Sequence, residues 1–290
     1  MSRLEGVRTN LPGPLPGVRR IVSISPSNTE ILHALGVGRR IVGTDDWSDY
    51  PPRARKLPKL GSDLRVDVTR VLALEPDLVV SSLHVPGMED NLPAFEAAGL
   101  RYLALGGLGL DGIWQDMRTI GHYLGRAERA DRLIAATRQR LQNVAERCRA
   151  LPDRPRVHWE WSAHPVVAAR RSWITELLHL AGGDNVYSDL DTESVRLQPA
   201  EAIARDPDVI VACWCGARKL PSVARIAARP GWQDTAAVRG GRVAVFAEDL
   251  FGRPGPRLAD GLERLAVLLH PELSLADGSP GPAAGQRRPR

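Results

Sequence analysis

The sequence has little cysteine, few aromatic residues and no long apolar run. Its 290 residues include three cysteines, Cys148, Cys213 and Cys215. An odd number, with two of them separated by a single residue, argues against a disulfide framework. No apolar stretch approaches the roughly 20 residues that a membrane-spanning helix requires. The composition therefore favours neither a disulfide scaffold nor an integral membrane protein.

The first residues lack the continuous apolar segment of a signal peptide, and they carry no cysteine for lipid attachment. Pro12, Pro14 and Pro16 interrupt this stretch instead. As the sequence stands, we expect a cytoplasmic protein. If an export signal is missing from it, we expect a periplasmic or cell-surface protein.

The charge pattern gives no sign of a nucleic-acid partner. The net charge is +5, with 25% charged and 43% apolar residues, which is ordinary for a soluble globular protein. The arginines are spread along the whole chain, so a solvated arginine-rich surface explains them better than an anionic partner does. We expect a monomer that neither binds nucleic acid nor inserts into a membrane.

Motifs of common hydrolases and metalloenzymes are also missing. The sequence contains no G-x-S-x-G nucleophile elbow, no glycine-rich phosphate loop and no H-E-x-x-H. The C-W-C run at 213–215 has no second cysteine pair with which to hold zinc or a cluster. His84, His158 and His164 do not follow a metal-site spacing. The sequence therefore favours a binding protein over an enzyme, without a metal site.

The sequence does contain an internal repeat. In the first half, I-V-S-I-S-P-S-N-T-E-I-L-H-A-L-G at 21–36 precedes L-A-L-E-P-D-L-V-V-S-S at 72–82. In the second half, V-H-W-E-W-S-A at 157–163 precedes T-E-L-L-H-L-A-G-G at 175–183 and A-I-A-R-D-P-D-V-I-V-A at 202–212. Each half reads as a strand, a helix that ends at glycine, and a second helix that leads into an apolar strand. The repeat predicts two lobes with a ligand cleft between them.

Strands that alternate with helices predict an α/β fold of two Rossmann-like lobes with mainly parallel sheets. We expect a flexible leader over 1–18, an N-terminal lobe over 19–110, a connecting helix over 111–151, a C-terminal lobe over 152–272 and a disordered tail over 273–290. Apolar residues recur at helical spacing between 111 and 151, and Gly125 marks a candidate break. One long helix, about 36 Å from Ala127 to Ala150, is expected to join the lobes.

Tryptophan is the most abundant aromatic residue, with seven against four tyrosines and three phenylalanines. Four of them lie where predicted strands end, namely Trp47, Trp159, Trp161 and Trp214. Ligands of open α/β sheets bind outside the carboxyl ends of the strands, and indole rings make flat, stiff walls. Alternation places Trp159 and Trp161 on one side of their strand and Glu160 on the other. As a group the four favour a ligand pocket, although each alone fits a core position equally well.

The loop E-D-L-F-G-R-P-G-P-R-L at 248–258 is a second candidate, because it follows a predicted strand and precedes a helix. Glycine and proline shape such a loop at a helix entrance. Asp249 and Arg253 can offer an acceptor and a planar donor fork to one polar edge of a ligand. From spacing alone, a salt bridge within the loop and a helix cap are an equally good interpretation.

Several of these motifs together resemble a known family. They are S-P-S-N-T-E-I-L at 25–32, W-S-D-Y-P-P at 47–52, L-A-L-E-P-D-L-V at 72–79 and L-A-G-G-D-N-V at 180–186. They are similar to motifs of the helical-backbone (class III) substrate-binding proteins of ABC importers, which carry haem, iron-siderophores, metals or cobalamin. The resemblance covers roughly residues 19–272. D-D-W-S-D-Y-P-P at 45–52 and D-L-F-G-R-P-G-P-R at 249–257 look most like the cobalamin-binding branch.

The resemblance implies a protein that binds cobalamin or a related corrinoid between its lobes for ABC-type uptake, with a permease as partner. Trp47 or Tyr50 and Trp161 would then pack on the corrin, with Trp159 and Trp214 beside them. Asp249 and Arg253 would bind its polar periphery. Acidic residues that dock such proteins on a permease would fall near Thr69 and Ala200, with Asp67 and Glu201 close by.

Two alternatives stay open. A haem or ferric-siderophore binder of the same fold would use a basic cleft, which Arg170, Arg171, Arg218 and Lys219 could supply. A metal-dependent oxidoreductase on a related two-lobed fold would need cysteine or histidine ligands that converge. On the first interpretation cobalamin is a bound ligand and not a catalytic cofactor.

Overall fold

The structure is a computed structural model, and it describes residues 6–217 and 219–273. It divides into two compact units. Unit 1 comprises the described residues up to Thr137 together with Arg253–Pro256, and unit 2 comprises Arg138–Gly252 together with the described residues from Arg257. Each unit is a sheet with helices, which confirms the predicted α/β fold of two lobes. Of the tail expected over 273–290, only Leu273 is among the described residues.

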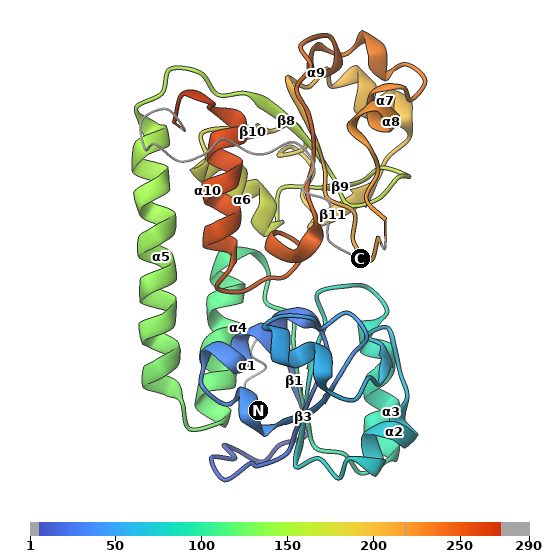
Figure 1. The fold of residues 1–290 in the computed structure, drawn as a ribbon, viewed down its shortest axis with the longest axis vertical. Coiled ribbons are helices and arrows are strands. Elements are labelled where there is room, and N and C mark those ends of the chain that lie inside the picture. Colours follow the sequence, from blue (N-terminus) through green and yellow to red (C-terminus); the bar gives the residue numbers. More distant parts are fainter. Residues whose placement is uncertain (1–5, 218, 274–290) are drawn as a thin grey trace. The chain divides into compact units, whose positions relative to one another are not determined.

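Unit 1 is built on a sheet of β1 (Val7–Thr9), β7 (Tyr102–Leu105), β6 (Leu78–Ser82), β2 (Ile21–Ser23) and β3 (Ile41–Thr44), in this order. Its other elements are α1 (Pro26–Ala34), α2 (Val68–Ala73), α3 (Leu92–Ala97), α4 (Gly109–Tyr123), the first part of α5 (Ala127–Arg149), and a hairpin of β4 (Gly61–Ser62) and β5 (Arg65–Val66). All strands of the sheet are parallel except β1. In Figure 1, α2 and α3 lie on one side of this sheet and α1 and α4 on the other. Burial on both faces explains why β2, β6 and β7 are almost continuously apolar.

The N-terminal segment differs from the flexible leader expected over 1–18. β1 pairs with β7 in antiparallel register at the edge of the sheet. Thr9 Oγ1 donates a hydrogen bond to the Tyr102 carbonyl oxygen (2.6 Å), and Asn10 Nδ2 donates to the Leu100 carbonyl oxygen (2.9 Å). A strand of three residues is too short for alternation to reveal it beside a proline-rich stretch.

Unit 2 is built on a sheet of β11 (Ser194–Arg196), β9 (Val166–Ala168), β8 (Arg156–Glu160), β12 (Val209–Ala212) and β13 (Val243–Val245), with β10 (Asp184–Asn185) beside β8. β8, β10, β12 and β13 are parallel, whereas β9 and β11 are antiparallel to their neighbours. In Figure 1, α6 (Trp173–Leu180) and α10 (Leu258–Leu269) lie on one side of this sheet, and α7 (Pro199–Ala204), α8 (Val223–Ala227) and α9 (Ala236–Arg239) on the other. The two halves of the repeat differ here, because β2 leads directly into α1 whereas β9 intervenes between β8 and α6.

The segment expected to be one connecting helix over 111–151 consists of two helices. α4 ends at Tyr123 and α5 begins at Ala127. Gly125 lies between them with a φ of 65°, a left-handed conformation that glycine adopts without strain. The boundary between the units falls within α5, after Thr137. Within the part of the chain that the structure describes, no helix is long and apolar enough to cross a membrane.

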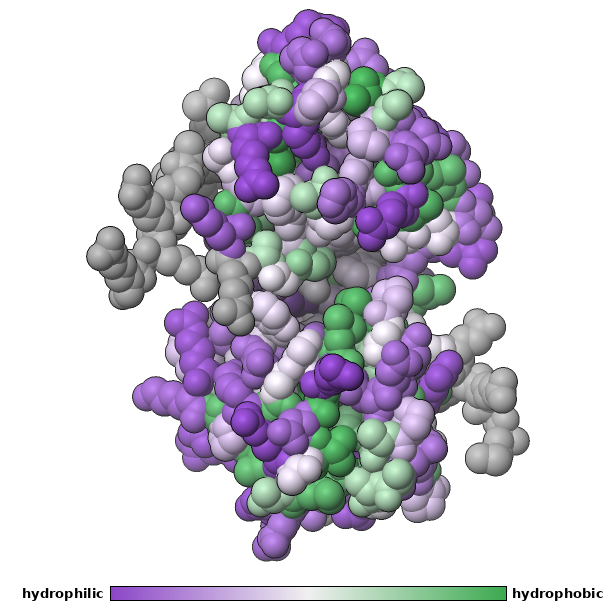
Figure 2. Space-filling view, turned by 90° about the vertical axis from the view of Figure 1, so that its right-hand side faces the viewer, coloured by the Kyte–Doolittle hydropathy of each residue, from purple (hydrophilic) through white to green (hydrophobic). Residues whose placement is uncertain are grey.

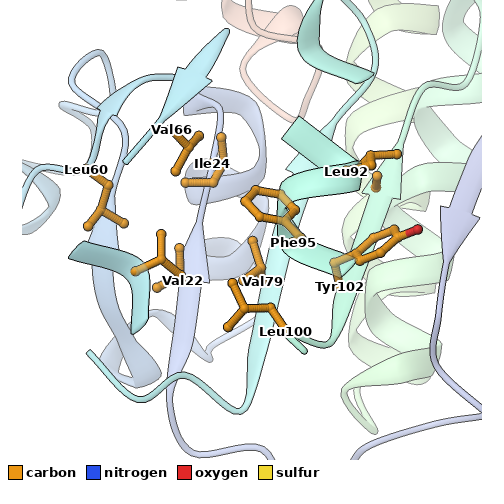
Figure 3. Close-up of a cluster of buried hydrophobic side chains, with 11 residues drawn as sticks. Val22, Ile24, Leu60, Val66, Val79, Leu92, Phe95, Leu100 and Tyr102 are labelled. Carbon is orange, nitrogen blue, oxygen red and sulfur yellow. The ribbon is translucent and has the colours of Figure 1, made fainter. Parts of the chain in front are cut away.

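The core of unit 1 packs α2 and α3 against the sheet. Figure 3 shows Phe95 of α3 inside this cluster, with Val79 of β6 and Tyr102 of β7 nearby. The rings of Phe95 and Tyr102 are 6.3 Å apart and tilted by 49°. Burying a side chain such as Phe95 contributes about 1.5–3 kcal/mol. In unit 2, Trp232 packs in a cluster with residues of β12 and of α7, α8 and α9.

Candidate functional site

The carboxyl ends of the parallel strands carry most of the candidate residues. Trp47 and Tyr50 follow β3 in unit 1. In unit 2, Trp161 follows β8 and Trp214 follows β12. Ligands of open α/β sheets bind outside these ends because the loops there diverge from the packed core. Each unit therefore presents aromatic side chains at the edge of its sheet where a ligand is expected.

Asp45 organises the loop that follows β3. Its carboxylate is fully buried and accepts hydrogen bonds from the backbone N–H groups of Ser25 (2.9 Å), Trp47 (2.8 Å) and Ser48 (3.0 Å), and from Ser48 Oγ (2.6 Å). Burial raises the pKa of Asp45, although these hydrogen bonds and Lys59 oppose the rise. Four donors use the full acceptor capacity of one carboxylate, so the backbone beneath Trp47 is held in one conformation.

Lys59 ties the same loop to the end of the strand. Its Nζ donates to Thr44 Oγ1 (3.0 Å), to the Asp45 carbonyl oxygen (3.0 Å) and to the Ser48 carbonyl oxygen (2.5 Å). Tyr50, further along the loop, is 43% exposed. The backbone of this loop therefore has little conformational entropy left to lose on binding.

Arg253 is nearly buried in unit 1, with carboxylates as partners. Its Nη1 donates to Asp49 Oδ1 (2.7 Å) and to Glu30 Oε1 (3.1 Å), and its Nη2 donates to the Trp47 carbonyl oxygen (3.5 Å). Burial alone would lower the pKa of Arg253, but the two carboxylates outweigh burial and raise it. Only 6% of the Arg253 side chain is exposed, so the guanidinium braces the loop that carries Trp47 more than it faces solvent.

Asp249 has a partner other than Arg253. Arg257 Nη2 donates to Asp249 Oδ2 at 3.3 Å, and both residues belong to unit 2. The salt bridge expected within this loop is present, but it joins Asp249 to Arg257, and the expected side-chain cap of the following helix is not formed. Side-chain exposure of 32% leaves Asp249 accessible to solvent. The prediction that Asp249 and Arg253 meet one ligand edge stays a prediction.

Exposed apolar side chains gather at the strand ends of unit 1. Tyr50, Leu64, Val85 and Leu108 are each between 41% and 53% exposed. They lie after β3, in the β4–β5 hairpin, after β6 and after β7. Apolar patches of this kind interrupt the polar surface in Figure 2. Single exposed apolar residues are common, but four at the loops of one sheet edge suit a broad apolar ligand.

Asp63 is a titratable carboxyl in the β4–β5 hairpin, next to Leu64. Burial and the charge of Asp45 raise the pKa of Asp63 to about 6. Both carboxyl groups lie near the loop that carries Trp47. Asp63 therefore changes its charge near neutral pH beside this loop.

Trp159 is a core residue, which corrects its predicted place in the ligand wall. It is 0% exposed, and its ring packs against Phe251 (4.9 Å between centroids) and Trp161 (5.8 Å). A fully buried ring cannot contact a ligand, so Trp159 supports Trp161 from behind. Trp161 is partly buried and also contacts Trp173, with centroids 6.0 Å apart. The alternation of side chains along a strand places Trp159 and Trp161 on the same side, in agreement with their ring contact, but it does not predict how deeply each ring is buried.

Glu160 is the last residue of β8 and is fully buried. Its carboxylate accepts hydrogen bonds from Trp214 Nε1 (3.0 Å), His158 Nε2 (3.0 Å) and Arg229 Nη1 (2.9 Å). Burial alone would raise the pKa of Glu160, but the hydrogen bond from His158 and the charge of Arg229 outweigh it, so the pKa lies below its usual value. An ionised carboxylate therefore holds the indole N–H of Trp214.

His158 completes this group of buried polar side chains. Its Nδ1 lies 2.5 Å from Tyr187 Oη, and its ring packs edge-on against Trp232 at 4.8 Å. Burial lowers the pKa of His158, so the ring is neutral near pH 7. The partners assign the proton to Nε2, which donates to Glu160, while the Tyr187 hydroxyl donates to Nδ1. With both nitrogens engaged, His158 is unsuited to bind a metal in this conformation.

Metal-ligand candidates do not converge in the described structure. His84 Nε2 lies 3.1 Å from Asp116 Oδ2. Cys213 is buried and Cys215 is exposed, and neither forms a disulfide. Across residues 6–217 and 219–273, no group of three or more His, Cys, Asp or Glu side chains is placed to hold a metal ion.

Sequence reasoning missed the partners that fix the aromatic residues. Glu30 and Asp49 hold Arg253, and Arg229 holds Glu160. The one available signal was Glu160 itself, because a charged residue inside an apolar strand requires a buried partner. The sequence does not show which residue is that partner, because Arg229 lies 69 positions further along the chain.

Comparison with known proteins identifies the family. A family model described as "Periplasmic binding protein" matches residues 21–250. The chain is 30% identical over 262 residues to the ABC transporter substrate-binding lipoprotein YvrC of Bacillus subtilis, covering 88% of this chain and 81% of that protein. It is 27% identical over 264 residues to the vitamin B12-binding protein of Vibrio cholerae, covering 88% of this chain and 90% of that protein.

Solved structures of binding proteins share the fold. The vitamin B12 binding protein BtuF of Vibrio cholerae superposes with a TM-score of 0.72 at 25% identity, covering 88% of this chain and 98% of that one. The heme-binding protein RhuT from Roseiflexus superposes with a TM-score of 0.77 at 29% identity, covering 88% and 99%. A heme-binding protein of Pseudomonas aeruginosa gives 0.76 at 28% identity, covering 88% and 93%. The resemblance to substrate-binding proteins is thereby confirmed, and this chain belongs to the periplasmic binding protein family.

Proposed function

We propose that this protein binds cobalamin or a related corrinoid and delivers it to an ABC-type importer. Its family and its relatives support the role of a substrate-binding protein. Relatives named as vitamin B12-binding proteins support the choice of ligand. In this role the protein is not an enzyme, and cobalamin is its cargo.

The observation that favours a corrinoid is that the arginines near the strand ends, Arg253 and Arg257, are already paired with carboxylates. Arg253 already neutralises part of the charge of Glu30 and Asp49, and Arg257 is paired with Asp249. Corrin is a broad apolar ring fringed with neutral amides, which can accept from and donate to such paired groups. A haem propionate would instead compete with Glu30 and Asp49 for Arg253, or with Asp249 for Arg257.

Aromatic and apolar side chains would supply the flat contacts. We propose Trp47 and Tyr50 from unit 1, and Trp161 and Trp214 from unit 2, as residues that pack on the ligand. Trp159 supports Trp161 instead of contacting the ligand. That one ligand contacts both units, as the repeat predicts, stays a prediction.

Haem is the second candidate, and one observation favours it. The heme-binding proteins from Roseiflexus and Pseudomonas aeruginosa superpose with higher TM-scores than the B12-binding protein does. The basic residues considered for an anionic ligand are partly engaged elsewhere, because Arg170 and Arg171 both pair with Asp191. Arg218 lies outside the described residues, and Lys219 is exposed.

An ABC permease is the proposed partner, on the outer side of the cytoplasmic membrane. Asp67 and Glu201, which lie close to the expected docking positions, both serve helix N-termini. Asp67 accepts from the Arg70 N–H at the start of α2, and Glu201 accepts from the Gln198 N–H at the start of α7. Each is exposed enough to reach a partner from this capped position.

Calorimetric titration with cyanocobalamin tests the proposal. We expect binding by the wild type and weaker binding after Tyr50→Ala or Trp161→Ala, because each removes an aromatic contact worth about 1–2 kcal/mol. Leu72→Ala is the matched control, since Leu72 on α2 is as exposed as Tyr50 but lies away from the strand ends. The proposal is refuted if the wild type gives no heat of binding, or if both aromatic variants bind as tightly as the wild type does.

A further inference from the structure

We propose that Glu160 is a positioning residue, which holds the Trp214 indole ring in the orientation that binds the corrinoid. The inference rests on the function proposed above. Glu160 itself is 0% exposed, so we infer that it acts on the ligand only through Trp214. It acts through one hydrogen bond to a ring at the surface.

The hydrogen bond from Trp214 adds a fixed direction to a ring that already packs against the cluster around Trp232. Trp214 lies two residues beyond the end of β12 and is partly buried. Its Nε1 donates to Glu160 Oε1 at 3.0 Å. Indole has this single donor, so the bond selects one ring orientation, and bonds to an ionised acceptor are stronger than neutral ones.

The carboxylate that receives this bond is itself immobile. Glu160 Oε1 accepts from Trp214 and Arg229 (3.1 Å), and Oε2 accepts from His158 (3.0 Å) and Arg229 (2.9 Å). These four contacts use the acceptor sites of both oxygens. The backbone is fixed as well, because Cys213 N donates to the Glu160 carbonyl oxygen at 2.9 Å.

The partners of Glu160 are anchored in turn by aromatic rings. The Arg229 guanidinium carbon lies 4.2 Å from the centroid of the Trp232 ring. His158 packs on the same Trp232 ring and meets the Tyr187 hydroxyl. A chain of fixed groups thus runs from the core of unit 2 to Trp214.

Stability alone is a weak reason for this arrangement. A buried ion pair is often no more stabilising than well-packed apolar residues of the same volume. What the carboxylate adds is direction, because an acceptor bonded to the single indole N–H distinguishes ring orientations that apolar packing alone would allow. A ring oriented before binding has less side-chain entropy to lose, which corresponds to about two- to tenfold in affinity.

Nuclear magnetic resonance of the ligand-free protein tests the hydrogen bond. The seven tryptophans give seven indole N–H signals after ¹⁵N labelling, and Trp214→Phe identifies the signal of Trp214. In Glu160→Gln, one acceptor oxygen replaces two, so Trp214 competes with Arg229 for it. We expect the Trp214 signal to move upfield while the signal of Trp47 stays in place. Asp191→Asn, at the roughly half-exposed ion pair with Arg171 in the same unit, is the control and leaves the Trp214 signal unchanged.

A double-mutant cycle with cyanocobalamin tests the role in binding. Glu160→Gln should weaken affinity about two- to tenfold. This loss should vanish in a Trp214→Phe background, where no indole N–H exists, and persist in a Trp161→Phe background. A purely structural role would give the same loss in both backgrounds. If Glu160→Gln does not fold, Glu160→Asp keeps the charge for Arg229, shortens the reach to Trp214 and should behave alike.

The outcomes separate this inference from the proposed function. A wild-type protein that does not bind cyanocobalamin overturns the function, and the resonance experiment then still decides whether Glu160 holds Trp214. An unmoved Trp214 signal, or an affinity loss that persists in the Trp214→Phe background, overturns the inference even if cyanocobalamin binds.

Discussion

Replacing Arg229 by methionine tests whether its guanidinium stabilises the buried carboxylate of Glu160. The change removes the guanidinium that bonds to both oxygens of Glu160, whose side chain is 0% exposed, and keeps an apolar stem against Trp232. Breaking a buried ion pair by removing one partner costs about 3–5 kcal/mol. His158 and Trp214 still donate to Glu160, which places the cost near the lower end of that range. Loss of the guanidinium from the Trp232 ring adds about 0.5–1 kcal/mol. We therefore expect a loss of about 3–4 kcal/mol near neutral pH.

The pH dependence of this loss gives a second, independent readout. In the wild type, burial and Arg229 hold the pKa of His158 below its unfolded value of about 6.5. The unfolded state therefore takes up protons first, and the stability contributed by neutral His158 is lost as pH falls below about 6.5. In the variant the opposing charge is gone, so protonated His158 can replace Arg229 as the partner of Glu160. The difference between the two proteins should shrink between about pH 8 and about pH 5.5.

Urea denaturation of both proteins across this pH range measures the effect. Arg171→Met is the matched control, because the Arg171–Asp191 pair in the same unit is roughly half exposed on both sides. We expect about 0–1 kcal/mol from it, without dependence on pH in this range. A loss below about 1 kcal/mol for Arg229→Met at about pH 8, or a loss that grows on acidification, refutes the reasoning.

Three further predictions concern unit 1. Phe95→Ala should lower the free energy of unfolding by about 3–5 kcal/mol in urea denaturation, because Phe95 is 0% exposed within its core cluster. A loss below about 1 kcal/mol would contradict that packing. Gly125→Ala should lower the free energy of unfolding by about 1–2 kcal/mol in the same measurement, because φ is 65° at this position and an added Cβ would lie 3.0 Å from Pro16 Cβ. An unchanged urea midpoint would count against the left-handed conformation of Gly125. Asp63 should titrate near 6 by carboxyl NMR. Because its folded pKa lies above the unfolded value, the contribution of Asp63 to stability should fall as pH rises from about 4 through 6, measured as the difference in unfolding free energy between the wild type and Asp63→Asn; a difference that does not change with pH would contradict the raised pKa.

The fold was predictable where local pattern alone determines it. Apolar runs such as Leu78–Ser82 are strands because both faces of a parallel strand are buried. The break at Gly125 follows from the freedom of glycine to adopt a positive φ. β1 was not predictable, because a strand of three residues acquires its structure only by pairing with β7.

The sequence predicts which candidate residues lie in loops after strands, but it does not predict their contacts. Strand ends and tryptophans locate Trp47, Trp161 and Trp214 correctly at loops. How deeply each of these side chains is buried, and which side chains it contacts, depends on residues that are distant in sequence. Arg253 meets Glu30, 223 positions away, instead of Asp249 four positions before it. Spacing along a loop does not encode such a pairing.

Whether the ligand is a neutral, amide-fringed corrinoid can be decided by a pair of titrations of the wild type, one with cyanocobalamin and one with hemin, under the same buffer and salt. We expect saturable one-to-one binding of cyanocobalamin at least about tenfold tighter than that of hemin, because Arg253 and Arg257 are already paired with carboxylates. Tighter binding of hemin, with a Soret shift that saturates at one equivalent, would contradict it.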